Sequence, residues 1–292
     1  MTSGRSVVIN GDLGSGKSTV SMLLARRLGI RRVSVGSLYR ELASQRGVTA
    51  LELNLHAELD DKIDHYVDQL QRDIARSDER LVVDSRLAWF FFADALKVHL
   101  ITEPTIAAAR VLGRTTSVEN YATIDEARAH LASRSESERA RFLIRYGADK
   151  TRLRNYDVVC DTTRATPQDI LDRIVDCLQA PPTPMPGPVC HLDPRRIFPT
   201  ADVTSPDQPE GSRGLSVGYA APHFFAVRGH QRLSSAVRSG QTLVEATLAA
   251  EGGETISGQP SDAYLHANAT AERIRAWERA HGVELPPLSA AQ

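Results

Sequence analysis

Short apolar segments alternate with segments of helical periodicity over the first 180 residues. The expected strands are apolar and β-branched along their length, as strands buried on both faces are. They cover residues 6–10, 31–35, 80–84, 96–101 and 156–161. The expected helices cover residues 18–28, 38–45, 59–74 and 168–179. Strands and helices in alternation predict a parallel sheet covered by helices, which is an α/β fold.

Two helical segments differ in their hydrophobic pattern. Residues 59–74 carry apolar side chains at helical spacing, which predicts an amphipathic helix: Leu59, Ile63, Val67, Leu70 and Ile74. Residues 104–149 are rich in charge and poor in any apolar stripe. We therefore expect this second segment to be a helical excursion outside the core.

A proline-rich segment, APPTPMPGP at 180–188, separates two parts of the chain. Five prolines in nine residues exclude a helix or a central strand, so we expect an extended linker. The predicted domains are 1–179 and 189–292. The second contains a polar loop at 200–214, a helix beginning near His230 and a final helix at 269–282.

Composition narrows the function classes. The chain has 292 residues and a formal net charge of −1, which gives no global attraction to nucleic acid or an anionic membrane. Three cysteines without a CxxC pair argue against a disulfide framework and a zinc site. The sequence shows no signal peptide and no apolar run long enough to span a bilayer. We expect a cytoplasmic protein without a membrane partner.

The segment GDLGSGKS at 11–18 fits the pattern G-x-x-x-x-G-K-[ST] between a predicted strand and a predicted helix. Its glycines allow backbone N–H groups to turn onto phosphates, and the helix adds its positive N-terminal dipole. Lys17 is expected to contact the β- and γ-phosphates, and the Ser18 hydroxyl to bind Mg²⁺. The predicted ATP and Mg²⁺ site consists of Gly11, Gly14, Ser15, Gly16, Lys17, Ser18 and Thr19.

Two further segments follow strands of the same sheet. Ser37 and Arg40 follow the second strand, and Asp84 and Arg86 end the third. Ligands of open α/β sheets bind beyond the carboxyl ends of the strands, so the three loops should converge. Arginine grips phosphate with two N–H groups, and Asp84 would hold Mg²⁺ or orient an acceptor. These four residues are the predicted acceptor site, with Ser18 and Asp84 as metal ligands.

The charged segment 104–149 carries four arginines at 134, 139, 141 and 145. Arginines on a flap would neutralise charge on a transferred phosphoryl group, and closure would exclude water. The alternative is a solvated helix in which Glu136 and Glu138 pair with the arginines. We predict a lid, with Lys17, Arg134, Arg139 and Arg141 as catalytic residues.

Residues 7–178 resemble the cytidylate kinases, in particular the short archaeal-type branch of the nucleoside monophosphate kinases. The matching stretches are GDLGSGKST, SVGSLYRELASQRG, DDKIDHYVD, SRLAWF, SESERARFLIRYGAD and NYDVVCDT. The resemblance implies a P-loop kinase with a five-stranded parallel sheet and a helical lid. It also implies transfer of the γ-phosphoryl group of ATP to CMP or dCMP with Mg²⁺. On that pattern Arg40 and Arg86 hold the acceptor.

The sequence departs from the family pattern at three places. Ser37 stands where the family usually has an acidic residue or threonine, and Asp84-Ser85 stands where glycine usually precedes the arginine. Ser135 replaces a glutamate that often follows the lid arginine. Two departures lie on the acceptor side, so two alternatives stay open. One is a kinase of a hydroxylated metabolite with Asp84 as base. The other is a nucleotide-gated binding protein with little turnover.

The second part of the chain resembles the ParB/sulfiredoxin-like domain through VCHLDPRRIFPT and HFFAVRGHQRLSSAVRSGQTLVEATL. The resemblance implies a smaller α+β domain that binds a nucleotide or phosphorylated ligand. The predicted anion site is Gly229, His230 and Arg232, at a helix N-terminus. The box lacks the cysteine that sulfiredoxin chemistry needs. No helix-turn-helix pattern supports DNA binding. The alternative for this domain is that it binds a pathway substrate or a partner protein, whose identity the sequence does not give.

Overall fold

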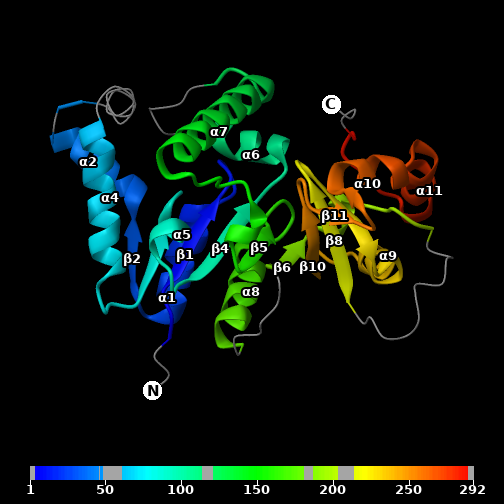
Figure 1. The fold of residues 1–292 in the computed structure, drawn as a ribbon, viewed down its shortest axis with the longest axis horizontal. Helices are drawn as coiled ribbons and strands as arrows, with labels where there is room; N and C mark the ends of the chain where they lie inside the picture. The colour runs from blue at the N-terminus through cyan, green and yellow to red at the C-terminus, as the bar shows by residue number, and fades with distance from the viewer. Residues whose placement is uncertain are drawn as a thin grey trace. The chain divides into compact units, whose positions relative to one another are not determined.

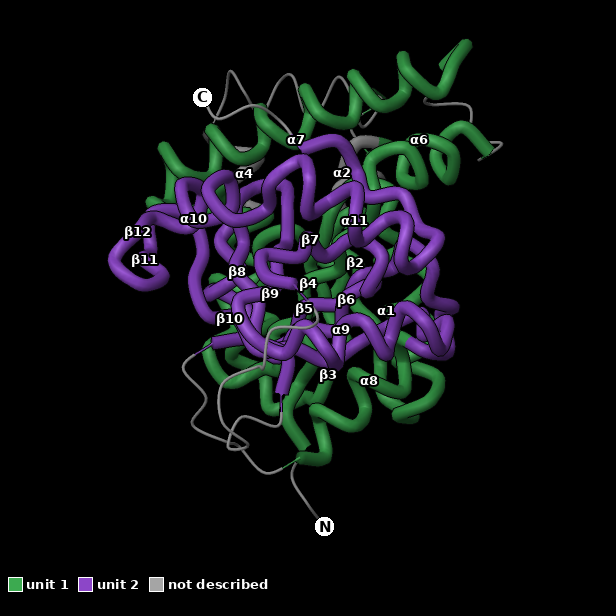
Figure 2. The backbone as a smooth tube through the Cα atoms, turned by 90° about the vertical axis from the view of Figure 1, so that its right-hand side faces the viewer, with its two compact units in different colours: residues 1–151, 170–180 green, residues 152–169, 181–292 purple. Residues whose placement is uncertain are grey.

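The structure is a computed structural model that describes residues 4–45, 47–48, 61–113, 121–180, 187–202 and 214–288 (Figure 1). The chain divides into two compact units (Figure 2). The first unit contains residues 1–151 and 170–180, and the second contains residues 152–169 and 181–292. Most of the predicted linker and of the polar loop lies outside the described residues.

The first unit contains four parallel strands in the order β2-β3-β1-β4. Their bounds are β1 Val7–Gly11, β2 Arg31–Ser34, β3 Leu81–Asp84 and β4 Leu96–Ile101. Strands β1, β3 and β4 run as near-continuous apolar segments, and β3 is buried at every position. The edge strand β2 differs from the expected apolar pattern, because Val33 is its buried residue and Arg31 is exposed. The parallel α/β sheet predicted from the alternation of strands and helices is confirmed for these four strands.

Helices connect and cover the strands. They are α1 Lys17–Leu28, α2 Val35–Gln45, α4 Asp61–Ala75, α5 Ala88–Phe91, α6 Pro104–Leu112, α7 Ile124–Tyr146 and α8 Pro167–Gln179. Each predicted helix of the first 180 residues is present within a few residues of its expected bounds. Residues 59 and 60 lie outside the described residues. Among the described residues, no helix has both the length and the apolar character needed to cross a bilayer.

Helix α4 buries polar residues where the sequence pattern predicts an apolar stripe. Val67, Leu70 and Ile74 are half-buried, whereas Asp68 and Gln71 are 5% and 3% exposed. The predicted amphipathic helix is therefore present, but the two most buried positions of its described part are polar. Burying a carboxylate and an amide needs a compensating set of hydrogen bonds.

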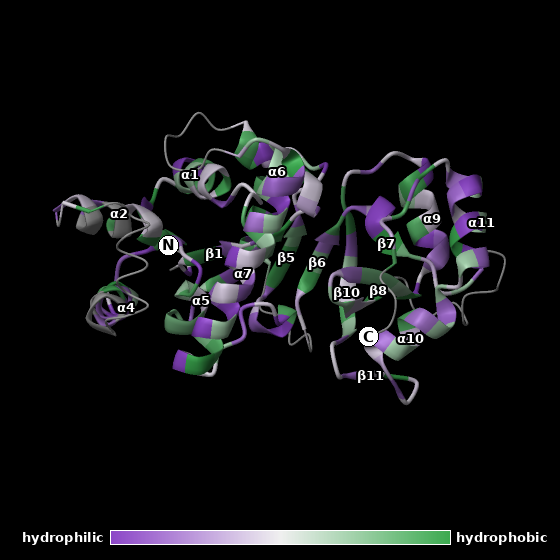
Figure 3. Ribbon diagram, turned by 90° about the horizontal axis from the view of Figure 1, so that it is seen from above, coloured by the Kyte–Doolittle hydropathy of each residue, from purple (hydrophilic) through white to green (hydrophobic). Residues whose placement is uncertain are grey.

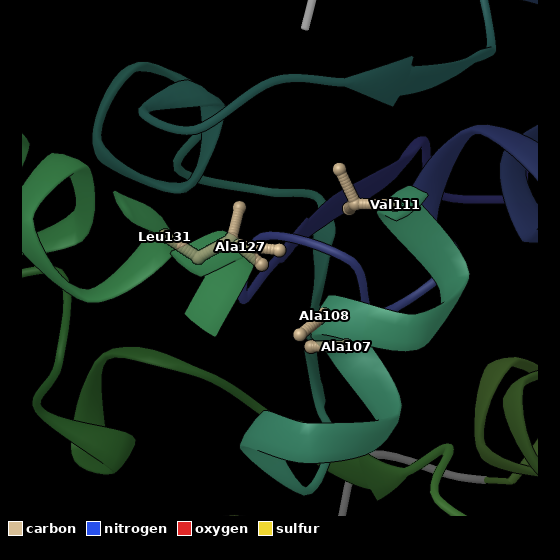
Figure 4. Packing of buried hydrophobic residues seen from close by; sticks show 5 residues of the cluster. All are labelled: Ala107, Ala108, Val111, Ala127 and Leu131. Carbon is tan, nitrogen blue, oxygen red and sulfur yellow. The ribbon is translucent and has the colours of Figure 1, made fainter. Parts of the chain in front are cut away.

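Helices α6 and α7 share a small apolar core, although the sequence pattern predicts a helical excursion outside the core for this segment. Five buried side chains on the two helices form one cluster (Figure 4): Ala107, Ala108, Val111, Ala127 and Leu131. The small alanines let the two helices approach closely. The first half of α7 is therefore packed on α6, and the second half buries Glu138 and Phe142.

The second unit contains a mixed sheet in the order β5-β6-β10-β8-β9-β7. Its strands are β5 Val158–Asp161, β6 Val189–Leu192, β7 Ile197–Phe198, β8 Leu215–Ala220, β9 His223–Arg228 and β10 Val244–Glu251. Pairs β5–β6, β10–β8 and β7–β9 are parallel, whereas β10–β6 and β8–β9 are antiparallel. A small hairpin pairs β11 Thr255–Ile256 with β12 Gln259–Pro260.

Among its described residues, the second unit has the helices α9 His230–Arg238, α10 Ser261–Asn268 and α11 Ala271–His281. The predicted helices at 230 and 269–282 are confirmed, whereas the sequence pattern missed α10 and the strands β8 and β10. Figure 3 shows α11 largely in the hydrophilic colour, and Trp277 is its buried contact residue. Two short 3₁₀ turns, Leu153–Asn155 and Pro194–Arg196, complete the unit.

Residues 152–169, which the sequence pattern places in the first domain, group with the second unit. Glu251 accepts hydrogen bonds from the backbone N–H groups of Leu153 and Arg154, at 2.7 and 3.2 Å. The Arg154 guanidinium pairs with Glu254 at 2.6 Å. At the other end of β5, Arg196 pairs with the buried Asp161 at 2.6 Å. The β5–β6 ladder and these charged contacts of long sequence separation join the segment to the second unit, and a local sequence pattern shows neither.

Candidate active site

The loop between β1 and α1 has the backbone shape that the glycine motif predicts. Gly11, Gly14 and Gly16 have φ angles of 154°, 82° and 85°. A Cβ atom at Gly11 would collide with the Leu100 carbonyl, and one at Gly14 would lie 2.8 Å from Ala107. A Cβ at Gly16 would meet nothing within 4 Å. Two glycines therefore fit the loop against its neighbours, and the third opens toward empty space at the helix N-terminus.

Lys17 begins α1 and lies across the loop. Its Nζ donates to the carbonyls of Gly11 and Asp12 at 2.7 and 2.9 Å. The buried Ser15 closes the turn, since its hydroxyl donates to the Asp12 carbonyl at 2.7 Å. The N-cap of α1 is Gly16, and no side chain caps the helix there. The first-turn N–H groups therefore remain directed at the loop, where a phosphate would accept from them.

Burial, together with the nearby Arg86 charge, lowers the pKa of Lys17 from its ordinary value to about 8. Asp84, Asp12 and Glu138 oppose this shift. The ammonium therefore keeps its proton at neutral pH in an environment that disfavours positive charge. A bound phosphate would relieve that cost by supplying negative charge.

Asp84 ends β3 beside the phosphate loop. Its Oδ2 accepts from the Ser18 hydroxyl at 3.1 Å and from Arg32 at 2.6 Å. Arg32 also donates to Ser21 at 2.7 Å, which fixes the guanidinium against α1. The structure thus brings the two predicted metal ligands together. A hydroxyl and one carboxylate fit Mg²⁺, which keeps several waters and takes its other ligands from phosphates.

Glu138 of α7 gathers three cations. Its Oε1 pairs with Arg86 and lies 3.4 Å from Arg134, and its Oε2 lies 3.0 Å from Lys150. Glu138 is 5% exposed, and the pKa of its carboxyl is lowered despite burial because of these cations, Arg86 foremost. Burial lowers the pKa of Arg86. One carboxylate against three cations leaves an excess of positive charge, as a site for phosphates requires.

The other predicted lid arginines have different surroundings. Arg139 pairs with Glu136 at 2.8 Å and with Asp149 at 3.4 Å, and these contacts raise its pKa. Arg141 lies 5.6 Å from the Phe142 ring centroid and is close enough to Arg86 to lower the pKa of that residue. Arg134 and Arg141 therefore belong to the charged cluster, whereas Arg139 is engaged by two carboxylates at its border.

Comparison with known proteins agrees with this arrangement. The family described as "AAA domain" matches residues 7–138. The cytidylate kinase of Natronomonas pharaonis is 37% identical over 166 residues, which cover 56% of this chain and 84% of that protein. The chain belongs to the cytidylate kinase family. The cytidylate kinase of Methanobrevibacter smithii is 32% identical over 173 residues, which cover 59% of this chain and 98% of that protein.

The shikimate kinase of Bacteroides thetaiotaomicron is a solved structure with 15% identity and a TM-score of 0.46; the match covers 60% of this chain and 99% of that one. The sequence match to the cytidylate kinase family spans less than two thirds of this chain. Family membership therefore covers a nucleoside monophosphate kinase part, and the second unit lies largely outside it.

On the acceptor side of the family site, the structure describes three of the four predicted residues. Asp84 and Arg86 lie at the end of β3, as described above. Ser37 is exposed in α2, and its backbone N–H donates to the Ser34 hydroxyl at 3.4 Å. The side chain of Arg40 lies outside the described residues. Thr19, the last predicted residue of the phosphate loop, is exposed on the first turn of α1.

In the second unit, Gly229 is the N-cap of α9 with a φ of 81°. His230 is 3% exposed, and its Nε2 accepts from the backbone N–H groups of Thr200 and Ala201, both at 3.1 Å. These hydrogen bonds fix the chain segment after β7, so His230 has a structural role here. Arg232 is exposed on the first turn of the helix.

Sequence reasoning missed several residues of the first unit's site. Lys150 and Arg32 are plain charged residues in the sequence, and Glu138 was considered only as a solvated partner. His99 is also buried, and its Nδ1 accepts a hydrogen bond from the Asn10 amide nitrogen at 3.2 Å. Burial and the Lys17 charge lower the pKa of His99 to about 3, so it is neutral. None of these positions belongs to a local motif.

Proposed function

We propose that the first unit transfers the γ-phosphoryl group of ATP to CMP or dCMP with Mg²⁺. The observation that supports this proposal most is that three features lie at one edge of the sheet: the glycine loop with Lys17, the Ser18–Asp84 pair, and the cation cluster around Glu138. Each matches one requirement of phosphoryl transfer, namely a phosphate cradle, a metal site and excess positive charge. The names of the family's relatives support CMP as acceptor.

Mg²⁺ bound with ATP would neutralise charge on the β- and γ-phosphates. Ser18 and Asp84 are the residues that would hold it, since their oxygens already lie 3.1 Å apart. Arg32 holds the Asp84 carboxylate in place from the other side. The chain thus positions the carboxylate by an ion pair within the protein.

Lys17 stabilises the phosphates of the donor, and the first-turn N–H groups of α1 donate hydrogen bonds to the same phosphates. Arg86 and Arg134 surround the transferred group together with Arg141, and Glu138 fixes their positions. Positioning and charge neutralisation carry this mechanism, because an acceptor phosphate is already anionic and needs no dedicated base.

The alternative of a hydroxylated metabolite as acceptor requires Asp84 as a general base. The Ser18 hydroxyl and the Arg32 guanidinium already occupy Oδ2 of this carboxylate, which favours the monophosphate acceptor. The other alternative, a nucleotide-gated binding protein, predicts tight ATP binding without turnover.

For the second unit, the ParB/sulfiredoxin-like assignment stays a prediction, and so does binding of a nucleotide or phosphorylated ligand. The α9 N-terminus, which lacks a side-chain cap, and the exposed Arg232 support the anion-binding proposal. His230 is engaged elsewhere, so Gly229 and Arg232 with the helix N–H groups would form the site.

The test is ADP release from ATP and Mg²⁺ with CMP, dCMP, UMP, AMP and hydroxylated metabolites as acceptors. We expect turnover with CMP or dCMP that Lys17→Ala abolishes. Turnover only with a hydroxylated metabolite would replace the proposed acceptor. ATP binding without turnover on any acceptor would support the gated binding protein.

A further inference from the structure

Two polar residues are the most buried described positions of α4, and the proposed mechanism does not use them. Asp68 and Gln71 are 5% and 3% exposed. They are three residues apart and therefore lie on one face of the helix. An amphipathic helix normally turns apolar side chains inward. Burying a carboxylate and an amide at these positions costs desolvation free energy that apolar side chains would not cost.

A chain of hydrogen bonds fixes the orientation of the Gln71 amide. The backbone N–H of Leu87 donates to the Ser85 hydroxyl at 3.2 Å, so that hydroxyl donates onward to Gln71 Oε1 at 2.8 Å. The amide oxygen is thereby used. Among the described residues, no further hydrogen bond is made by Gln71, so its NH₂ group supplies donors beside Ser85 and the adjacent Arg86.

Asp68, one turn earlier on α4, supplies hydrogen-bond acceptors where Gln71 supplies donors. Its Oδ2 accepts from the Tyr146 hydroxyl at 2.8 Å and lies 3.9 Å from Arg145 Nε. A carboxylate offers about four lone-pair positions and can therefore accept from several donors at once. Tyr146 lies among aromatic rings, with centroids 5.8 Å from Phe90 and 6.1 Å from Phe142. The pair therefore combines an amide donor and a carboxylate acceptor beside flat apolar surface.

We propose that Gln71 and Asp68 bind the hydrogen-bonding edge of the acceptor's base and select cytosine against uracil. This proposal rests on the proposed function and names two specificity residues for the same site. Cytosine presents an acceptor at N3 beside a donor at its 4-amino group, which match the Gln71 NH₂ and the Asp68 carboxylate. Uracil presents a donor at N3 beside an acceptor at O4. It would set donor against donor and acceptor against acceptor.

Two further consequences follow from the same donor and acceptor pair. Guanine has the uracil arrangement at this edge and would be rejected, whereas adenine has the cytosine arrangement. Base size therefore has to separate AMP from CMP. A site built to hydrogen-bond one edge rejects the mismatched one strongly, because its own buried polar groups would be left unpaired.

The experiment measures kcat/KM for CMP and UMP in the full chain, with Gln71→Glu, Asp68→Asn and the double variant. We expect each single variant to lower the CMP-to-UMP ratio by about tenfold or more, and the double variant to lower it further, since the donor and acceptor would be exchanged. The KM for ATP should stay within about twofold of the wild type.

Gln69→Glu is the matched control, because Gln69 is exposed on the same helix and the chemical change is identical. It should leave the CMP-to-UMP ratio unchanged. Gln71→Leu removes the donors without adding charge, and thermal unfolding of each variant identifies any that fails to fold.

Equal losses with CMP and UMP in folded variants would assign the pair a structural role and overturn this proposal alone. Wild-type turnover with neither CMP nor UMP would overturn the proposed function and the base selection with it. A ratio that shifts only in Gln69→Glu would also overturn the assignment.

Discussion

Each unit contains a strand that passes through a left-handed glycine into a helix, and the two turns differ in what surrounds them. Gly16 leads from β1 into α1 with a φ of 85°, and Gly229 leads from β9 into α9 with a φ of 81°. A Cβ at Gly229 would lie 2.8 Å from the Gly214 carbonyl, whereas a Cβ at Gly16 would meet nothing. The same backbone shape therefore serves close packing in one turn and leaves space for a ligand in the other.

The residue after each glycine shows the same difference. Lys17 follows Gly16 and places a charge across the phosphate loop, where its Nζ donates to two backbone carbonyl oxygens. His230 follows Gly229 and is buried, with its Nε2 engaged by two backbone N–H groups. A glycine at a helix N-terminus thus indicates a binding site only when the next side chains are available to a ligand.

The largest expected effect comes from removing the charge at the first turn. Lys17→Ala should lower kcat/KM for ATP by about 10³-fold, because a preorganised charge on the phosphates would be lost. Steady-state ADP release with CMP measures this. The Lys150→Ala variant is a comparison that removes a cation from Glu138 and should cost less. A Lys17→Ala enzyme with near-normal turnover would contradict the phosphate-loop assignment.

A pair of glycine substitutions should separate the two turns. Gly229→Ala should lower the free energy of unfolding by about 2–5 kcal/mol, since left-handed strain adds to a backbone clash. Gly16→Ala should cost only the strain, about 1–2 kcal/mol, but reduce ATP turnover strongly. Denaturant unfolding and kcat/KM measured on both variants check this. Equal stability losses would show that Gly16 is also a packing position.

The charge of Lys17 gives the phosphate loop a pH dependence. Its pKa of about 8 in the free protein means that the ammonium loses its proton as pH rises through 8. We expect kcat/KM for ATP to fall by about tenfold between pH 7 and 9, since kcat/KM reports the ionisation of the free enzyme. Bound phosphates should raise the pKa of Lys17, so kcat should fall only at higher pH. A flat kcat/KM profile over this range would contradict burial of the charge.

The stability of the free protein should change in the opposite sense. Because the folded-state pKa of Lys17 lies below its ordinary value, charging this group costs stability at pH values below about 8. That cost disappears as pH rises toward the ordinary value. Lys17→Met should therefore raise the melting temperature at pH 7, and the gain should shrink toward pH 10. A variant less stable than wild type at pH 7 would show that the hydrogen bonds of Lys17 outweigh its desolvation.

The smallest expected effect concerns the second turn. Arg232→Ala should weaken binding of CTP or ATP to the second unit by about tenfold, with no change in kcat for CMP phosphorylation. Lys17→Ala serves as the background, so that binding to the first unit does not obscure the result. Calorimetric titration measures the affinity. Unchanged binding, or no binding before the substitution, would contradict the anion-site prediction.

The parts of the molecule that a local pattern determines were predictable from sequence. The phosphate loop follows from three glycines, Lys17 and Ser18, and the strands of the first sheet follow from buried apolar runs. The alternating burial of β10 is also visible in its sequence as a period of two, and its signal was missed because small alanines weaken it.

The remaining features depend on partners that are far away in the sequence. Asp68 and Gln71 look like solvated helix residues until Tyr146 and Ser85 are placed beside them. Glu138 looks like an i+4 partner of Arg134, and only the fold brings Arg86 and Lys150 to it. Hydrogen bonds of this kind stabilise buried polar groups without leaving a periodic pattern, so sequence reasoning found the sheet edge but not these residues.

The carboxylates that hold residues 152–169 have a consequence for the order in which the chain folds during synthesis. Arg154 bonds to Glu254, 100 residues later, and Leu153 bonds to Glu251, 98 residues later. A ribosome adding about 5–20 residues per second produces these partners about 5–20 s after the segment itself. Leu153 and Arg154 therefore lack these carboxylate partners until most of the second unit has been translated, whereas the β6 partner of β5 is made much earlier.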